Sequence, residues 1–166
     1  ISRELFDYDE ILKPRLVSIE GTTLSNNSVE FTTLSTIYDS NLDILRENNH
    51  DFNVTEYPGD KEKEFFKSEI EKVYKILFKK VELWKDALKD QEETGDEIRK
   101  ELRAQYTILK PFGQRALMKA YLYMKLKYRK RDGSAFSDNE ICNAFNKIDW
   151  KLENEQWRGV MTKSGD

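Results

Sequence analysis

Hydrophobic residues recur at spacings of three and four in the first patterned stretch of the chain, from about Ser28 to Leu45. Such spacings stack side chains on one face of a helix. The apolar members of this face are Phe31, Leu34, Tyr38, Leu42 and Leu45. The polar run Ser25–Ser28 precedes them and offers several possible helix caps. Threonines and serines inside the stretch lower its helix propensity, so packing must stabilise the helix.

The longest apolar stripe predicts one amphipathic helix from Lys61 to about Asp90, after a polar loop over residues 48–59. Asp60 is a good N-cap residue, but Lys63 occupies the position at which a capping box needs Glu or Gln. The stripe consists of Phe66, Ile70, Val73, Tyr74, Leu77, Val81, Trp84 and Leu88. Lysines and glutamates fill the opposite face, which is typical of a helix that lies on a core.

Two further helices are expected over residues 95–106 and 114–132. Pro111 and Gly113 lie between them. Because proline lacks a backbone donor and glycine can take a left-handed conformation, these residues predict a tight corner. Gln114 then stands at the start of the second helix, where its amide can bond exposed backbone groups.

The last part of the chain combines one helix with a tail. Ser137 and Glu140 have the spacing of a capping box and predict a helix through Phe145. Trp150 and Trp157 are expected to anchor the tail by aromatic burial, and residues 157–161 have the pattern of a short strand. The predicted fold class is therefore mainly α: an irregular helical bundle with one long amphipathic helix and at most a short β-hairpin at the C-terminal end.

Composition limits the classes of protein to consider. The 166 residues suit a single helical domain, and because Ile1 is not an initiator Met we expect a fragment of a larger protein whose N-terminal half is missing. The net charge of -3 means that any nucleic-acid contact must use a local basic patch. Cys142 is the only cysteine, which excludes an intrachain disulfide. No apolar run is long enough to span a membrane, so we expect a cytoplasmic protein.

Candidate catalytic residues are few. His50 is the only histidine and lies in a polar loop, where histidines are usually solvated. Cys142 follows a helical pattern, in which cysteines usually pack and stay inert. A Cys-His dyad between the two stays open, but a zinc site needs more Cys and His ligands than the chain has. With no P-loop and no dinucleotide-binding glycine motif, the sequence contains no visible catalytic set, and we expect neither a cofactor nor a metal.

Basic residues concentrate at the end of the expected 114–132 helix. On a helical wheel, Arg115, Lys119, Arg129 and Lys130 share a face and Lys125 lies at its edge; Lys127 and Arg131 are close by. Cations at a helix C-terminus offset the macrodipole without any ligand, whereas the same cations can also contact phosphates. The candidate DNA-binding residues are Arg115, Lys119, Lys125, Arg129 and Lys130, and a solvated, dipole-compensating helix end is the alternative.

The same helix is apolar on two sides. Its inward face is predicted to consist of Leu117, Ala120, Tyr121, Met124 and Tyr128. Leu122 and Leu126 are expected to point the other way, among the basic residues. A helix that is apolar on two sides is often covered on both. The expected covers are the adjacent tail, a homodimer partner or the missing N-terminal domain.

Three segments resemble the C-terminal half of the DndB-like, or DGQHR-domain, family. The first is Thr22–Ser28 running into Phe31–Tyr38, the second is Lys110–Leu117, and the third is Lys147–Trp150 followed by Trp157–Val160. Together they span most of the chain in the family's order. The Asp-Gly-Gln-His-Arg motif that gives the family its name is absent, so no activity tied to that motif carries over.

The resemblance implies an association with bacterial DNA phosphorothioate modification or related defence loci. It leads us to expect a DNA-associated regulatory and binding module, similar to a transcriptional repressor. Two alternatives stay open: an accessory domain of an enzyme whose active site lies in the missing half, or a structural dimerisation domain. DNA affinity with a steep salt dependence favours the first. Activity only in a longer protein, or dimerisation without DNA binding, favours the others.

Overall fold

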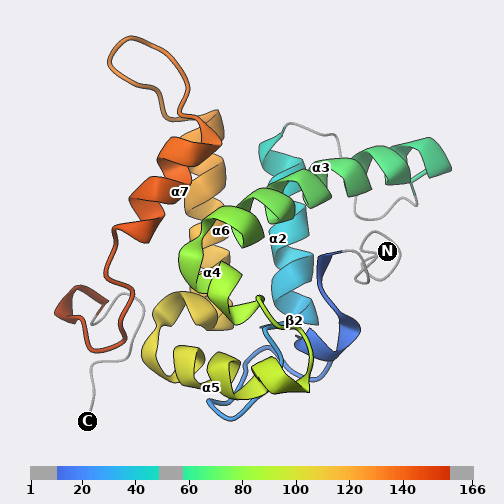
Figure 1. The fold of residues 1–166 in the computed structure, drawn as a ribbon. Coiled ribbons are helices and arrows are strands. Elements are labelled where there is room, and N and C mark those ends of the chain that lie inside the picture. Colours follow the sequence, from blue (N-terminus) through green and yellow to red (C-terminus); the bar gives the residue numbers. More distant parts are fainter. Residues whose placement is uncertain (1–10, 49–57, 158–166) are drawn as a thin grey trace.

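The computed structural model describes residues 11–48 and 58–157 (Figure 1). Within these ranges the chain forms six α-helices: α2 (Leu34–Glu47), α3 (Asp60–Lys80), α4 (Glu82–Ala87), α5 (Asp96–Gln105), α6 (Pro111–Leu126) and α7 (Asp138–Asn146). Four short 3-10 turns accompany them: η1 (Pro14–Leu16), η2 (Glu93–Gly95), η3 (Thr107–Leu109) and η4 (Glu155–Trp157). The mainly α fold class is confirmed. The expected C-terminal hairpin falls largely on residues 158–166, outside the described residues.

The first helix begins later than its sequence pattern predicts. Residues Thr32–Thr33 form the two-residue strand β2, which pairs in parallel with β1 (Val17–Ser18). The Thr33 hydroxyl then caps α2 by accepting a hydrogen bond from the Thr36 backbone N–H at 3.1 Å. The predicted start at Ser28 is therefore wrong, because the strand pairing and the cap fix the start at Leu34. Ile37 and Ile44 are buried on the inner face of α2, while Tyr38 is exposed.

The long amphipathic helix is broken at Val81, which has an extended backbone conformation. Asn146 of α7 supports the break, because its side-chain amide donates to the Lys80 carbonyl at 2.9 Å and accepts from the Glu82 N–H at 3.0 Å. The prediction of one continuous helix to Asp90 is thus wrong. The start also differs: Gly59 is the N-cap residue, and its N–H donates to the Glu62 carboxylate at 3.0 Å.

The inner face of α5 carries charged side chains. Ile98 is 51% exposed, whereas Arg99 and Arg103 are 1% and 0% exposed. Arg103 donates to the carbonyls of Ser28 and Glu30, and Arg99 donates to the Val29 carbonyl at 3.0 Å. These two arginines fix the irregular segment before β2, whose carbonyls would otherwise be buried without donors.

Helix α6 begins at Pro111, three residues before the predicted start. Proline suits the first position of a helix because the missing N–H has no partner there. Gly113 lies inside the helix and has an ordinary backbone conformation, so its predicted left-handed role is wrong. Glycine is required there for space, since a Cβ would lie 2.1 Å from the Thr107 carbonyl oxygen. The buried Gln114 amide donates to the Phe31 carbonyl at 2.8 Å.

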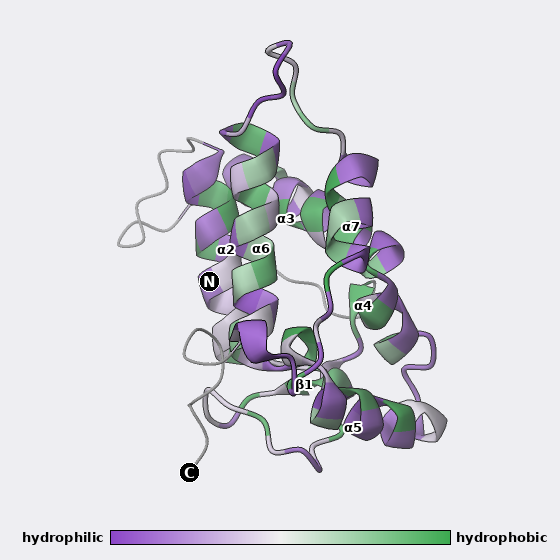
Figure 2. Ribbon diagram, turned by 90° about the vertical axis from the view of Figure 1, so that its left-hand side faces the viewer, coloured by the Kyte–Doolittle hydropathy of each residue, from purple (hydrophilic) through white to green (hydrophobic). Residues whose placement is uncertain are grey.

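The helices pack around α6. Helix α2 contacts it on one side and α7 on another, while α3 crosses over α2 and α7 (Figure 1). Figure 2 shows hydrophobic and hydrophilic residues alternating around α5, α6 and α7, as expected for helices that lie on a shared core. The core includes Leu16, Phe31, Ile37, Ile44, Ile70, Leu77, Trp84, Ile108, Leu117 and Ile141.

Aromatic side chains anchor the centre and the tail. Trp84 is 2% exposed, packs edge-on against Phe31 and donates its indole N–H to the Ile108 carbonyl at 2.9 Å. In the tail, the rings of Trp150 and Trp157 stack with centroids 5.2 Å apart. The predicted aromatic anchoring of the tail is confirmed, with Trp150 as the buried member.

Candidate nucleic-acid interface

Two of the five candidate cations lie between α6 and α2. Arg115 pairs with Asp39 at 2.6 Å and lies 3.6 Å from Asp43, and Lys119 lies 3.7 Å from Asp43. Further along α6, just past its end, Lys127 pairs with Glu47 at 2.5 Å. The acidic residues of α2 and their partners at α6 follow each other in the same sequence order. The two helices therefore run parallel, with an acidic stripe on α2 facing a basic stripe on α6.

The remaining pairs join α6 and the following loop to α7. Lys125 pairs with Asp138 at 2.7 Å, and Lys130 pairs with Glu140 at 2.6 Å. The hydrogen bond from Lys130, together with those from Ser137, lowers the pKa of Glu140 to about 2. Glu140 is therefore charged at neutral pH and remains the counter-charge of Lys130.

The basic residues do not form the single helical face that the sequence predicts. Helix α6 ends at Leu126, and residues 127–137 form a projecting loop that leads to α7 (Figure 1). Arg129 and Lys130 belong to this loop, whereas Arg115, Lys119 and Lys125 belong to α6. The predicted helix end at Asp132 is wrong because the backbone turns into a hairpin-like structure instead.

The loop between α6 and α7 is internally bonded. An isolated antiparallel bridge joins Arg129 to Ala135, and the Lys130 N–H donates to the Ser134 carbonyl at 2.9 Å. Gly133 has a φ of 82°, which favours glycine at this turn. Asp132 accepts from the Ser134 N–H at 2.9 Å. We call residues 127–135 the basic hairpin; it contains four cations and one carboxylate.

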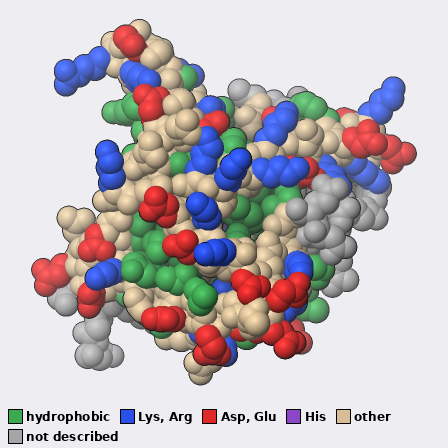
Figure 3. All heavy atoms as spheres, in the orientation of Figure 1, with side chains coloured by type: hydrophobic (Ala, Val, Ile, Leu, Met, Phe, Trp, Pro, Cys, Tyr) green, Lys and Arg blue, Asp and Glu red, His purple; other side chains and the backbone are tan. Residues whose placement is uncertain are grey.

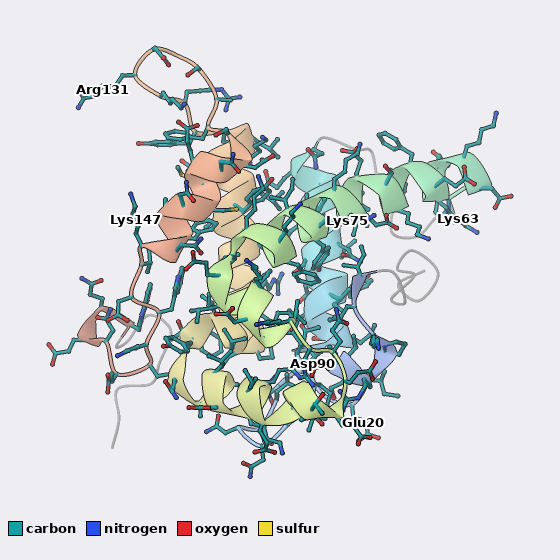
Figure 4. The ribbon with its side chains drawn as sticks, in the orientation of Figure 1. Glu20, Lys63, Lys75, Asp90, Arg131 and Lys147 are labelled. Carbon is teal, nitrogen blue, oxygen red and sulfur yellow. The ribbon has the colours of Figure 1, made fainter. Side chains whose placement is uncertain are left out.

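Arg129 and Arg131 differ from the other cations of this region. Both are exposed, and within the described part of the chain neither has a carboxylate partner. Figure 4 shows Arg131 pointing outward from the tip of the hairpin. Their charges are thus available to an external anion.

Aromatic rings support the base of the hairpin. Tyr128 stacks with Phe136 at a centroid distance of 6.0 Å and contacts Tyr123 at 6.2 Å. The Lys130 ammonium group lies 5.4 Å from the centre of the Phe136 ring. Tyr123 and Tyr128 are 55% and 50% exposed. Exposed aromatic rings beside unpaired arginines are a combination that nucleic acids can contact.

The apolar sides of α6 differ from their prediction. Leu122 is 2% exposed and Leu126 packs partly against the core, although both were expected to face outward. Ala120 and Tyr128 were expected inside and are exposed. The helix packs against both α2 and α7, so its second apolar side is covered by the chain's own helices.

The residues with catalytic chemistry do not form a reactive group. Cys142 is 1% exposed, and burial raises the pKa of its thiol, so the neutral form is favoured at neutral pH. His50 lies outside the described residues, so the Cys-His alternative stays a hypothesis. Among residues 11–48 and 58–157, no three His, Cys, Asp or Glu side chains gather as metal ligands. None of the described helices combines the length and apolar character needed to cross a bilayer.

The pairing of α6 with α2 was missed at the sequence level, although a signal for it exists. Asp39, Asp43 and Glu47 recur at intervals of four, which places them in one stripe of α2. A matching stripe of cations on α6 predicts a helix pair as well as a phosphate site. Only the spatial neighbours of α6 distinguish the two.

Comparison with known proteins identifies a family for this chain. The family model DndB, described as DNA-sulfur modification-associated, matches residues 1–166. No curated protein and no solved structure matches the chain.

Proposed function

The chain belongs to the DndB family of DNA-sulfur modification-associated proteins, and from this membership we propose that it is a regulatory, repressor-like module that contacts DNA through its basic hairpin. Arg129 and Arg131 would bind backbone phosphates directly, and Lys130 would assist them from the same loop. The observation that carries the proposal is the pairing pattern around α6. The helical cations have carboxylate partners, whereas these two loop arginines have none in the described residues.

The shape of the hairpin supports contact with a duplex. A projecting loop with arginines near its tip can approach a groove or a phosphate row that a flat helical face cannot reach. Phosphate contacts position a protein without reading bases, so this surface alone would bind DNA with little sequence preference. The exposed rings of Tyr123 and Tyr128 would lie against sugar or base edges next to the phosphate contacts.

The other candidate cations have a secondary role in this proposal. Arg115, Lys119 and Lys125 hold α6 against α2 and α7 and would add only a weak background potential. Lys130 is shared between Glu140 and the Phe136 ring, so a phosphate would have to compete with both. The proposal therefore ranks Arg129 and Arg131 above the other cations.

Fluorescence anisotropy with a labelled DNA duplex at low salt tests this ranking. The variant Arg129→Ala/Arg131→Ala removes two unpaired loop cations and is expected to weaken binding by about tenfold or more, since each lost charge-assisted contact contributes roughly 1–2 kcal/mol. The matched control Arg115→Ala/Lys119→Ala removes the same charge from the paired stripe and should retain most of the affinity.

The two variants also distinguish a local site from a general charge effect. If both lose affinity equally, DNA responds only to net charge and the hairpin is not a site. If neither binds less tightly than the wild-type chain, the hairpin has no role in DNA contact.

A further inference from the structure

Helices α3 and α4 share a short sequence pattern. In each, lysines occupy the first and fifth positions and a large apolar residue occupies the fourth. The residues are Lys75, Phe78 and Lys79 in α3, and Lys85, Leu88 and Lys89 at α4. In α3 these positions share one face of the helix, whereas Leu88 and Lys89 follow the end of α4 at Ala87. The helix is interrupted at Val81, and residues of α3, of α4 and of the turn after α4 line one surface.

That surface is a groove of about 590 Å³, to which Ile11 and Gln91 also contribute. Phe78, Leu88 and Ile11 provide its apolar floor, with Leu88 only 8% exposed. Exposed lysine side chains form the rim. Figure 3 shows lysine and arginine side chains gathered around hydrophobic ones at the centre of this face, and Figure 4 shows that Lys75 lies far from Arg131 at the tip of the basic hairpin.

The rim lysines contrast with the cations of α6. In the described part of the chain, Lys79, Lys85 and Lys89 have no carboxylate partner, and Lys75 pairs with Glu71 at 2.9 Å. Two like charges four residues apart on a helix repel each other. Lys75 and Lys79 have this spacing within α3, and Lys85 and Lys89 add two further positive charges to the same rim. An anionic occupant would offset this accumulation of positive charge.

We propose that this lysine-rimmed groove binds a short acidic segment of a partner protein. Apolar side chains of the segment would cover Phe78 and Leu88, and its carboxylates would meet the rim lysines. The volume lies within the range typical of ligand-binding clefts. A DNA backbone matches the charge of the rim but offers no apolar groups for the floor. A peptide with both kinds of side chain fits the surface better.

A labelled synthetic peptide of Asp and Glu residues around a central Leu-Phe pair is the probe. Its anisotropy is measured with the wild-type chain and with Lys79→Glu/Lys85→Glu. This variant reverses two charges of the rim, so that the rim repels an anion, and leaves the buried core unchanged. The expected loss of affinity is about tenfold or more, because facing like charges strongly disfavour association. The control Lys61→Glu/Lys147→Glu makes the same change in net charge at exposed positions outside the groove and should bind like the wild type.

A second peptide tests the apolar floor. It keeps every carboxylate and replaces Leu-Phe by Ser-Ser, and its binding should be markedly weaker. Equal binding of the two peptides, or of the two charge variants, overturns the proposal. So does a duplex DNA that binds more tightly than the peptide and depends on Lys79 and Lys85, because the groove would then be a nucleic-acid surface. The peptide test is independent of the DNA-binding test, so the proposal for the basic hairpin can fail without affecting the proposal for the groove.

Discussion

At the scale of single residues, the two buried arginines of α5 best illustrate what hydropathy patterns miss. The helix was predicted over residues 95–106, and its existence is confirmed. Its inner face, however, consists of Arg99 and Arg103, because the backbone carbonyls of residues 28–30 need donors inside the protein. The hydropathy pattern of a helix carries no information about carbonyl groups that are distant in the sequence. The burial of the two arginines could therefore not be predicted from it.

Asp96 gives this network a pH dependence. Its carboxylate accepts from Arg15 at 2.8 and 3.0 Å and also pairs with Arg99. The hydrogen bond from Arg15 lowers the pKa of Asp96, and the bond from Arg99 adds to this against the opposing effect of burial. The folded-state pKa is therefore below the unfolded one, so the ionised carboxylate stabilises the fold above about pH 4 and this contribution is lost as pH falls through the folded pKa.

The Asp96→Asn variant tests this expectation. It should lower the free energy of unfolding at pH 7, and the difference from the wild type should shrink as the pH falls below about 4 and through the folded-state pKa of Asp96, where the carboxyl becomes neutral. Urea unfolding across this range measures the difference. A constant difference between the two proteins at all pH values would mean that the charge of Asp96 does not stabilise the fold.

The close packing at Gly113 leads to a second prediction about a single residue. An alanine there gains helix propensity, but its Cβ would meet the Thr107 carbonyl oxygen at 2.1 Å, and this backbone atom cannot rotate away. Gly113→Ala should therefore destabilise the protein by about 1–3 kcal/mol in denaturant unfolding. Gly59→Ala is the control, because its nearest neighbour would be a flexible Glu62 oxygen at 3.7 Å. A Gly113→Ala protein as stable as the wild type would contradict the close packing of η3 against α6.

At the scale of elements, long apolar stripes located the helices well and their ends poorly. The capping box of Ser137 and Glu140 correctly marked the start of α7. The break at Val81 has no proline or glycine as a signal. It depends on Asn146, which lies far away in the sequence, so only the folded chain reveals it.

Asn146 is therefore expected to stabilise the junction of α3 and α4. Asn146→Ala removes both hydrogen bonds to the Lys80 and Glu82 backbone groups and should cost about 1–2 kcal/mol, since water can partly replace them. Asn143→Ala, at an exposed position of the same helix, should stay within about 0.5 kcal/mol of the wild type. Thermal or urea unfolding of the pair gives the comparison. Equal stabilities would show that the helix breaks without help from Asn146.

At the scale of the whole molecule, the small net charge of -3 conceals an uneven distribution. Acids of α2 and α7 neutralise the cations of α6. Among the described residues, Arg129 and Arg131 of the basic hairpin and Lys79, Lys85 and Lys89 of the lysine-rimmed groove have no carboxylate partner. The sequence located the basic cluster and suggested phosphate contact. It could not separate paired from unpaired cations, because that depends on which helices α6 contacts.

The family resemblance pointed to DNA sulfur modification, which the charge pattern could not indicate. The DndB family match confirms the association with DNA sulfur modification. Contact with DNA remains our proposal, and it places the contact at the basic hairpin. The helix face that the sequence predicted is instead engaged in holding the bundle together.

The most direct test of this account is the salt dependence of DNA binding. The logarithm of the affinity falls with the logarithm of salt concentration by roughly 0.9 for each phosphate contact that releases a counterion. The slope for Arg129→Ala/Arg131→Ala should be shallower than that of the wild-type chain by roughly 2, because two such contacts are lost. For Arg115→Ala/Lys119→Ala the slope should be nearly unchanged. A wild-type slope that is retained by the hairpin variant, or lost equally in both variants, would contradict DNA contact through the basic hairpin.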